Sequence, residues 1–355
     1  MDANKTTSSK RKLYLTIAIA VGLIVLVSGF VIVSSFAGGF FASLSAGQST
    51  IAGNAKIVTD TGTADGKALQ FTAPATIPPT TPTQPPTGST TCPLPKYPSD
   101  ACTGVPSTAK LMTVNGDYNA KAGEVIDSKN VTGNIIINGN DVVIRNSRIG
   151  GKVDNESSRA SFTIEDSTVG LDSGCGSISD GLVGVANFTA RRLRIKGQPD
   201  GFRVAGSNVL IEDSYITVCS KNPDDHSDGL QVYGAANAKN IVIRHNVFDQ
   251  RPVTNGAATA PIFIPTDADR QGNNGVTVTV TDNVVAGGGF GFRIYGTLPL
   301  TAYVTGNKVV NNTWGYGPVD VTCDKIKSWS GNAVITYDWA SGTILSQVRA
   351  LTDCN

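Results

Sequence analysis

Residues 142–149 read VVIRNSRI, and related eight-residue segments return seven more times along the chain. The later copies begin at residues 162, 188, 209, 241, 278, 302 and 327, so successive copies start between 20 and 37 residues apart. A strand motif that returns at this period, with insertions of variable length between copies, is typical of a β-solenoid. The sequence therefore predicts an all-β fold, a parallel β-helix of at least seven coils over residues 120–340.

The sixth position of the repeat is nearly always a short polar residue. Its occupants are Ser147, Ser167, Leu193, Ser214, Asn246, Asn283, Asn307 and Asn332. Coils stacked about 4.8 Å apart would align these side chains into a hydrogen-bonded ladder. The alternative is a sandwich of unrelated strands with asparagine in ordinary turns, and eight copies in the same phase argue against it. His245 fills the fifth position, a turn position in the other copies, so we expect a structural role for it.

A second pattern precedes several of the copies. It reads DGLVGV at 180–185, DGFRVAG at 200–206, DGLQVYG at 228–234 and FGFRIYG at 290–296. The alternation of large apolar residues predicts strands with one face in the core. The side chains expected to point outward are Arg203, Gln231, Tyr233, Arg293 and Tyr295. Each coil should therefore hold at least two strands, with the long insertions gathered beside them as a binding surface.

The first 36 residues predict a membrane anchor. Residues 1–12 include four basic side chains, and residues 13–36 are almost wholly apolar and long enough to span a bilayer as one helix. Basic residues before such a run predict a cytoplasmic N-terminus and an extracytoplasmic body. We prefer an uncleaved, single-pass signal anchor in the cell membrane. The small residues at 35–37 and 43–45 are alternative cleavage sites that would give a secreted protein.

Residues 37–91 are expected to join this anchor to the folded body. Within them, IVTDTGTADGKALQF at 57–71 is similar to the opening strands of some carbohydrate-binding β-sandwich modules. The match is far too short for such a module, so we expect a remnant of one or a short hairpin. Residues 73–91 are rich in proline and threonine, which predicts an extended, semi-rigid spacer. The β-helix domain then covers residues 92–355.

All six cysteines follow the apolar run, which suggests disulfides in an exported protein. They are Cys92, Cys102, Cys175, Cys219, Cys323 and Cys354. Many pairings are possible, but closeness in sequence favours Cys92–Cys102 and Cys323–Cys354 as clasps at the two ends of the solenoid. Cys175–Cys219 would then join two insertions. A zinc site is the alternative, although no CxxC or HxxxH spacing supports it.

GEVIDSKNVTGNIIINGNDVVIRNSRIGG at 123–151, followed by FTIEDSTV and later by HSDGLQVYG and IVIRHNVF, resembles known secreted proteins. These are the bacterial right-handed parallel β-helix proteins of the pectate-lyase-like superfamily. The resemblance covers about residues 103–340 and implies a right-handed β-helix. That superfamily includes lyases, hydrolases, epimerases and non-enzymatic adhesins, so the fold alone does not settle the function.

The strongest candidate for chemistry is the insertion NPDDHSDGLQ at 222–231. His226 lies there among Asp224, Asp225 and Asp228, and a histidine among carboxylates suits acid–base chemistry. The alternative is a solvated acidic turn. Asp224 and Asp225 are also candidate Ca²⁺ ligands, because clustered carboxylates suit that ion. No other cofactor is expected.

Neighbouring coils would supply the rest of the site. Asp200 and Asp228 begin successive Asp-Gly strands and should stack one rung apart. Arginine binds a carboxylate as a two-pronged fork, and aromatic rings stack on sugars. The expected catalytic residues are His226, Asp228 and Arg203. The expected substrate-binding residues are Asp200, Gln231, Tyr233, Asp267, Arg293 and Tyr295.

These residues favour a protein that acts on an acidic polysaccharide or envelope glycan, as a lyase, C5-epimerase or hydrolase. DDHSD at 224–228 is loosely similar to the Asp-Pro-His-Asp motif of mannuronan C5-epimerases, whereas the Asn-Thr-Asp and Gly-His-Gly motifs of polygalacturonases are missing. The alternative is a non-catalytic glycan-binding or adhesin-type surface protein. An enzyme should gather the catalytic residues in one pocket, and a binding protein should spread them along a shallow face. A formal net charge of +1 shows no nucleic-acid footprint, and we expect a monomer.

Overall fold

The computed structural model describes residues 92, 96–178, 180–253, 258–267 and 273–354, together with the backbone of four short strands nearer the N-terminus. The chain divides into two compact units, Met1–Gln84 and Pro85–Asn355. In the first unit, β3 (Ala55–Thr59) pairs in antiparallel fashion with β4 (Lys67–Phe71), which confirms the expected hairpin.

Two further strands of the first unit lie inside the segment expected to be a membrane helix. β1 (Val25–Val27) and β2 (Phe30–Ile32) form an antiparallel pair, so the described part of residues 13–36 is strand rather than helix. Their valine and isoleucine residues suit strands well. Among the described residues, no helix is long and apolar enough to cross a membrane. The spacer expected at 73–91 lies outside the described residues, so that prediction remains untested, as does the membrane location of the N-terminal segment.

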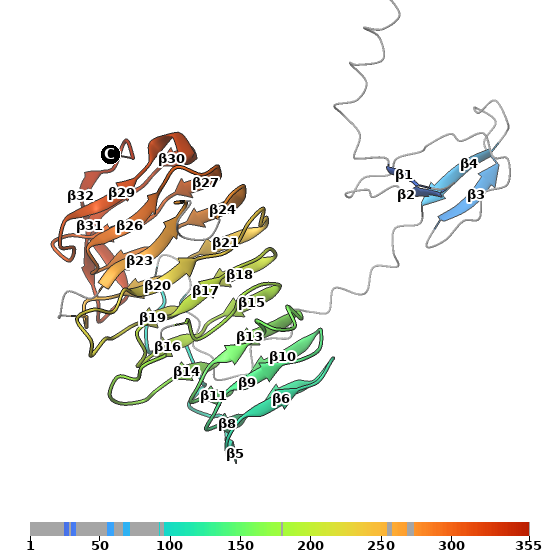
Figure 1. The fold of residues 1–355 in the computed structure, drawn as a ribbon, viewed down its shortest axis with the longest axis horizontal. Helices are drawn as coiled ribbons and strands as arrows, with labels where there is room; N and C mark the ends of the chain where they lie inside the picture. The colour runs from blue at the N-terminus through green and yellow to red at the C-terminus, as the bar shows by residue number, and fades with distance from the viewer. Residues whose placement is uncertain are drawn as a thin grey trace, which may run out of the picture. The chain divides into compact units, whose positions relative to one another are not determined.

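The second unit is built from three parallel sheets, through which the chain passes in turn (Figure 1). The first sheet contains β7 (Val125–Asp127), β10 (Val142–Arg145), β13 (Phe162–Glu165), β15 (Phe188–Arg191), β18 (Val209–Glu212), β21 (Ile241–Arg244), β24 (Val276–Thr281), β27 (Leu300–Thr305) and β30 (Ile326–Ser330). The second contains β5 (Met112–Val114), β8 (Lys129–Val131), β11 (Arg148–Ile149), β14 (Thr168–Gly170), β16 (Arg194–Lys196), β19 (Tyr215–Thr217), β22 (Val247–Asp249), β25 (Val284–Ala286), β28 (Lys308–Val310), β31 (Ala333–Asp338) and β32 (Thr343–Ala350).

The third sheet has two parts. β6 (Tyr118–Ala120), β9 (Ile135–Ile137) and β12 (Val153–Asp154) form one part, and β17 (Phe202–Val204), β20 (Ser227–Val232), β23 (Ala258–Pro265), β26 (Phe290–Tyr295) and β29 (Gly317–Val321) form the other. Isolated parallel bridges join the two parts through Val183. All pairs of neighbouring strands in the three sheets are parallel except the antiparallel closing pair β31–β32.

The eight sequence repeats stack in register. Val142 pairs with Phe162, Phe162 with Phe188 and Phe188 with Val209, and the same register continues to the copy at residue 302. The last copy pairs in the same way after a one-residue shift at Ala302. In the described residues of this unit, the only helical element is the short 3-10 turn η2 (Cys323–Lys325). An all-β stack of long parallel sheets in chain order is confirmed, and it is consistent with the expected parallel β-helix.

The fifth and sixth repeat positions make the turn between the first and second sheets. The fifth residue is left-handed in all eight copies. Six of them are not glycine and have φ between 47° and 53°, and the other two are Gly306 (φ 73°) and Gly331 (φ 66°). The six are Asn146, Asp166, Arg192, Asp213, His245 and Asp282. At the sixth position, the backbone N–H of Asn246 donates to Asn283 Oδ1 at 3.0 Å, and that of Asn283 donates to Asn307 Oδ1 at 3.1 Å. The predicted ladder is thus confirmed, because these buried amides complete the hydrogen bonds of the turn backbone.

The core lies between the three sheets and consists of the alternating apolar residues. Val209 and Ile211 are fully buried, whereas Leu210 between them is only half-buried on the outer side, as its phase predicts. Phe162 and Phe188 stack one coil apart with ring centroids at 5.3 Å. Stacked identical side chains of this kind stabilise adjacent coils.

All three disulfides have the expected pairing: Cys92–Cys102, Cys175–Cys219 and Cys323–Cys354. Cys323–Cys354 lies in the last coil, as expected. Cys92–Cys102 does not close the first coil, however. The segment that carries it runs along the outside of the second sheet, where Tyr97 contacts the last coils and Gly104 contacts Arg192. Sequence proximity gave the pairing but not this path, because long-range contacts decide where the segment lies.

Candidate functional site

The side chains expected to face outward form a column on the third sheet. The strand register places Arg203 beside Gln231, followed by Phe263, Arg293 and Asp320 on β17, β20, β23, β26 and β29. The residues that alternate with them point into the core, since successive side chains of a strand lie on opposite faces. The predicted spacing, with Arg203 and Gln231 on consecutive coils and Arg293 two coils further on, is confirmed.

Asp200 and Asp228 stack one coil apart, also as predicted. The backbone N–H of Asp228 donates to Asp200 Oδ1 at 2.8 Å, and the N–H of Ala260 donates to Asp228 Oδ1 at 3.2 Å. Asp228 is only 1% exposed and Asp200 8%. The carboxylates therefore complete backbone hydrogen bonds at the start of these strands, and Asp228 is not on the accessible surface where its predicted catalytic role would place it.

Burial has a strong effect on the acidity of Asp200. It raises the pKa of Asp200 to about 7, and the carboxylates of Asp180 and Asp225 add to the rise. The hydrogen bond from Asp228 and the positive charge of Arg203 act in the opposite direction. Asp200 is therefore a carboxyl group that exchanges a proton near neutral pH, beneath the outer face of the third sheet.

A hollow of about 410 Å³ opens between the insertion 223–226 and the third sheet. His226 and the two aspartates before it form one wall, and Arg293 and Phe290 of β26 form another. Tyr316, just before β29, completes the rim and is 83% exposed. The structure thus brings His226 together with Arg293, whereas Arg203, Asp228 and Gln231, which the sequence grouped with His226, do not line this hollow.

Arg293 lies in an aromatic environment. Its guanidinium carbon is 4.4 Å from the ring centroid of Tyr295, 5.6 Å from that of Phe290 and 5.8 Å from that of Phe263. Its Nε donates to Asp320 Oδ2 at 2.8 Å. Its two terminal nitrogens make no hydrogen bond with any described residue, so the forked end of the guanidinium remains available to a ligand.

Arg203 has a different environment, further down the column. Its Nη1 lies 3.2 Å from Asp180 Oδ1, and its guanidinium carbon lies 4.9 Å from the ring centroid of Tyr233. Gln231, the next residue of the column, is half-buried. Asp267 follows the end of β23 and does not line the hollow. The predicted residues are therefore distributed along one face, with only part of them at the hollow.

The insertion that carries His226 is held by its own hydrogen bonds. Asp225 accepts hydrogen bonds from Ser220 and, at 3.3 Å, from Asn222 Nδ2, while the backbone N–H of Asp224 donates to Asn222 Oδ1 at 3.0 Å. His226 is exposed and makes no hydrogen bond with the described residues. Within the described ranges, no group of three or more histidine, cysteine or acidic side chains is arranged to hold a metal, and the calcium prediction remains untested.

The Cys175–Cys219 disulfide ties two insertions together beside this face. Residues 171–180 end at Asp180, the partner of Arg203, and residues 218–226 end at His226. The backbone N–H of Cys219 also donates to the carbonyl of Gln198 at 3.0 Å. The disulfide therefore restrains both the loop that neutralises Arg203 and the loop that forms a wall of the hollow.

Sequence reasoning missed Phe290, Tyr316 and Asp320. Phe290 and Tyr316 pack with ring centroids 5.6 Å apart, and Asp320 is the register partner of Arg293. Phe290 belongs to the FGFRIYG segment and was visible as part of a strand. Tyr316 and Asp320 lie beyond the last outward strand that the repeat pattern identifies, so only the stacking of β29 on β26 reveals them.

A second hollow, of about 520 Å³, lies on the first sheet. Neutral polar side chains such as Asn187 and Asn208 line it, and its only ionisable lining residue is Asp141. Asn187 and Asn208 already bond to each other at 3.0 Å. It contains none of the predicted site residues, so the hollow on the third sheet is the better candidate site.

Comparisons with family models, with curated proteins and with solved structures found no match to this chain.

Proposed function

We propose that this protein binds an acidic polysaccharide on the outer face of the third sheet, with the hollow at Arg293 as its principal contact. The observation that carries the proposal is the state of Arg293. Its terminal nitrogens have no partner among the described residues, it lies on the wall of the hollow, and it is surrounded by aromatic rings. Such a guanidinium suits a bidentate contact to a carboxylate.

The rim of the hollow suits a sugar ring. Tyr316 presents an exposed aromatic face beside Phe290, and an amphipathic ring of this kind stacks on the apolar face of a pyranose. His226 stands on the opposite wall and adds a hydrogen-bond donor. The column from Arg203 to Arg293 would then contact successive residues of an extended polymer.

Binding without turnover agrees best with the way the predicted catalytic residues are spread along the third sheet. Asp228 is buried and bonded to the backbone, Arg203 lies further along the column beside Asp180, and neither residue lines the hollow with His226. A surface that offers spaced contacts along one shallow face is what a glycan-binding or adhesin-type protein needs.

Enzymatic turnover of the polysaccharide is the second candidate function, and the raised pKa of Asp200 is the observation that favours it. A carboxyl group with a pKa of about 7, within reach of the charges of Arg203, Asp180 and Asp225, suits general acid–base catalysis at neutral pH. In a lyase or C5-epimerase, Arg203 would neutralise the uronate carboxylate while the proton beside that carboxylate is removed. A hydrolase would require a second accessible carboxylate beside Asp200.

The three disulfides support an extracytoplasmic location, since such bonds persist in oxidising compartments. We further propose a single-pass N-terminal anchor, a right-handed coil as in pectate-lyase-like proteins, and a monomeric state. Right-handed crossovers are the rule for parallel strands. Calcium at Asp224 and Asp225 remains part of the proposal, as a bridge between the loop and an acidic ligand.

The test is titration calorimetry of the full chain against polyuronates, sulfated glycans and neutral glucans. Parallel assays would follow unsaturated ends and new reducing ends. We expect binding of a polyuronate, and Arg293→Lys should weaken it about tenfold despite retaining the charge, because lysine cannot form the two-pronged contact.

Arg145→Lys is the matched control. Arg145 also bonds through Nε to one carboxylate, that of Asp127 at 2.8 Å, but it lies on the first sheet. Equal loss in both variants, or binding of neutral glucans only, would contradict the proposed site. Release of unsaturated or reducing ends would instead establish the enzyme.

A further inference from the structure

Residues 96–105, here called the strap, cross the outside of the second sheet. They run from the last coil toward the middle of the stack, in the direction opposite to that in which the coils follow one another. Near the last coil, the backbone N–H of Tyr97 donates to the carbonyl of Gly342 at 2.8 Å. Further down, the N–H of Gly104 donates to the carbonyl of Arg192 at 2.8 Å, and Asp100 forms an ion pair with Arg194. The strap therefore connects the late coils of the stack with the middle ones.

Apolar packing holds the upper part of the strap. Tyr97 is 6% exposed and packs on outward-facing residues of the second sheet, including Val247, Val284 and Ile335. Burial also raises the pKa of Tyr97 to about 12, and the carboxylate of Asp282 contributes to this. The tyrosine is thus a neutral anchor over the working range of pH.

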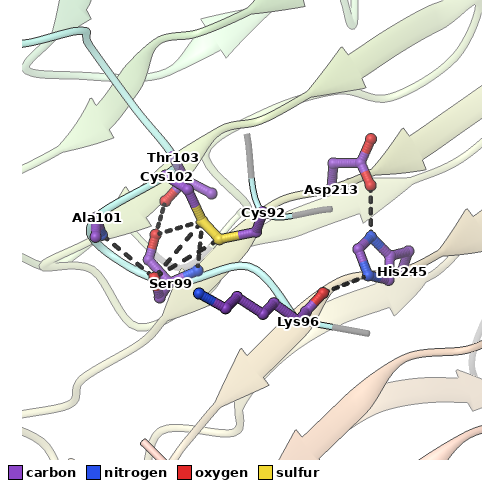
Figure 2. The surroundings of a disulfide bond; sticks show 8 residues. All are labelled: Cys92, Lys96, Ser99, Ala101, Cys102, Thr103, Asp213 and His245. Atoms are coloured by element: carbon purple, nitrogen blue, oxygen red, sulfur yellow. Dashed lines mark hydrogen bonds and ion pairs between the residues drawn. A yellow bond between two sulfur atoms is a disulfide. The ribbon is translucent and has the colours of Figure 1, made fainter. Parts of the chain in front are cut away.

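His245 is placed between the strap and the solenoid, as Figure 2 shows. Its Nδ1 lies 2.6 Å from Asp213 Oδ1, and its Nε2 lies 3.1 Å from the backbone carbonyl oxygen of Lys96. The ring also packs on Tyr97, with centroids 5.1 Å apart. The His245 side chain is 13% exposed and that of Asp213 is 43% exposed.

Both partners of the imidazole are acceptors. A backbone carbonyl accepts only, and an ionised aspartate accepts only, whereas a neutral imidazole has a single N–H to donate. Satisfying both contacts therefore requires a proton on each ring nitrogen. If Asp213 held the proton instead, the pair would still contain one proton more than a neutral histidine beside a carboxylate.

We propose that His245 is a proton-dependent clasp, which carries both ring protons while the strap is docked and loosens the strap when one of them leaves. This inference is independent of the proposed glycan function. Loss of one proton would set a nitrogen lone pair against either the Lys96 carbonyl or the Asp213 carboxylate, and one contact would become repulsive.

The charged groups around the clasp act in a mixed way. Asp213 contacts the ring directly, and Asp282 occupies the same turn position one coil further on. Lys96 and Tyr97 approach from the strap. Arg244, the residue before His245, is paired with Glu212 at 2.5 Å, and Lys308 lies close enough to Asp282 to feel its charge. The two carboxylates favour the protonated ring, and the lysines oppose it.

The sign of the pH effect follows from this arrangement. Because the docked strap requires the additional proton, docking is strongest when histidine is protonated and weakens as the pH rises through the range in which histidine loses its charge. Tyr97 burial and the Asp100–Arg194 pair remain at all these pH values. The strap should therefore loosen rather than detach.

The full chain contains only two histidines, and the experiment labels both with ¹⁵N. Long-range ¹H–¹⁵N spectra between about pH 5 and about pH 8 report how many protons each ring carries. His226→Ala assigns the two signals, and His226 in the unmodified chain serves as the exposed reference. We expect His245 to carry both ring protons while the strap is docked, because both of its nitrogens face acceptors.

Amide hydrogen exchange then measures the strap itself. Protection of the Tyr97 and Gly104 amides should fall about tenfold as His245 loses its proton, in line with the contribution of a charge-assisted hydrogen bond. His245→Asn tolerates the left-handed backbone (φ 52°) and should show weak strap protection without this pH dependence. Core amides such as those of Ile243 and Val280 should not change.

Asp213→Asn provides the second variant and should move the loss of strap protection to lower pH. The proposal is overturned if His245 carries a single ring proton, with Asp213 ionised, while Tyr97 remains fully protected. It is also overturned if His245→Asn retains the protection and pH dependence of the unmodified chain.

Discussion

The backbone N–H of Asp228 donates to the side chain of Asp200 one coil away, at 2.8 Å, and the accepting carboxyl group is almost completely buried. Asp228, expected to be catalytic, and Asp200, expected to bind substrate, thus belong largely to the structure of the coil. Their properties can nevertheless be measured, because burial raises the pKa of Asp200 to about 7.

The first prediction concerns the pH dependence of stability. In the unfolded chain Asp200 has the ordinary acidity of an aspartate, so between about pH 4 and pH 7 the folded state binds the additional proton. Its contribution to stability is present at low pH and is lost as the pH rises through about 7. Asp200→Asn retains the acceptor oxygen. In this variant, the fall in the free energy of unfolding between about pH 4 and pH 7 should be smaller by on the order of 2–4 kcal/mol.

Chemical denaturation of the full chain at several pH values tests this. The exposed residue Asp324 supplies the control, since Asp324→Asn removes a carboxylate at the surface. An Asp200→Asn chain with an unchanged pH profile would show that the buried carboxyl is ionised throughout.

The second prediction concerns Tyr316. Its side chain is 83% exposed, so Tyr316→Ala should leave the free energy of unfolding unchanged within about 0.5 kcal/mol. Loss of a stacking surface should weaken polyuronate binding by about tenfold. Tyr303→Ala, on the outer side of the first sheet, is the matched control, and calorimetry on both variants decides whether the rim of the hollow contacts the ligand.

The third prediction concerns the asparagine ladder. Asn283 is fully buried, and its Nδ2 donates to the carbonyls of Ile243 and Thr281 at 2.9 and 3.0 Å. Asn283→Ala removes both of these hydrogen bonds and leaves the buried backbone N–H of Asn246 without its acceptor, so it should lower the free energy of unfolding by about 2–4 kcal/mol. Asn138→Ala, which removes an exposed side chain, should cost much less in the same denaturation experiment.

The fourth prediction concerns the Cys175–Cys219 disulfide. The double variant Cys175→Ala/Cys219→Ala should lower stability by about 3–4 kcal/mol, because the bond closes a loop between residues 44 apart in sequence. Because this bond restrains the wall that carries His226, polyuronate binding should weaken as well. Removing Cys92–Cys102 should leave binding unchanged, and equal effects of the two variants would show that the loops do not form the site.

The fold was largely predictable because its cause is periodic. The recurrence of VVIRNSRI places branched apolar residues at alternate positions, and this alone gives strands that must stack in register, with asparagine and serine in the turns. The three disulfide pairings followed from order in the sequence. The expected helix at 13–36 shows the limit of this reasoning, since an apolar run rich in valine and isoleucine suits either a strand or a helix.

The candidate site depended on contacts that no local pattern encodes. By itself, the sequence determined the stacked coils, the outward phase of Arg203, Gln231 and Arg293, and the left-handed turn at His245. Only the tertiary structure decided that Asp228 is buried, that Tyr316 borders the hollow with Arg293, and that Lys96 reaches His245. Outward phase follows from the alternation within one strand, whereas accessibility depends on which distant insertion or strap covers that strand, and those segments have no repeat to constrain them.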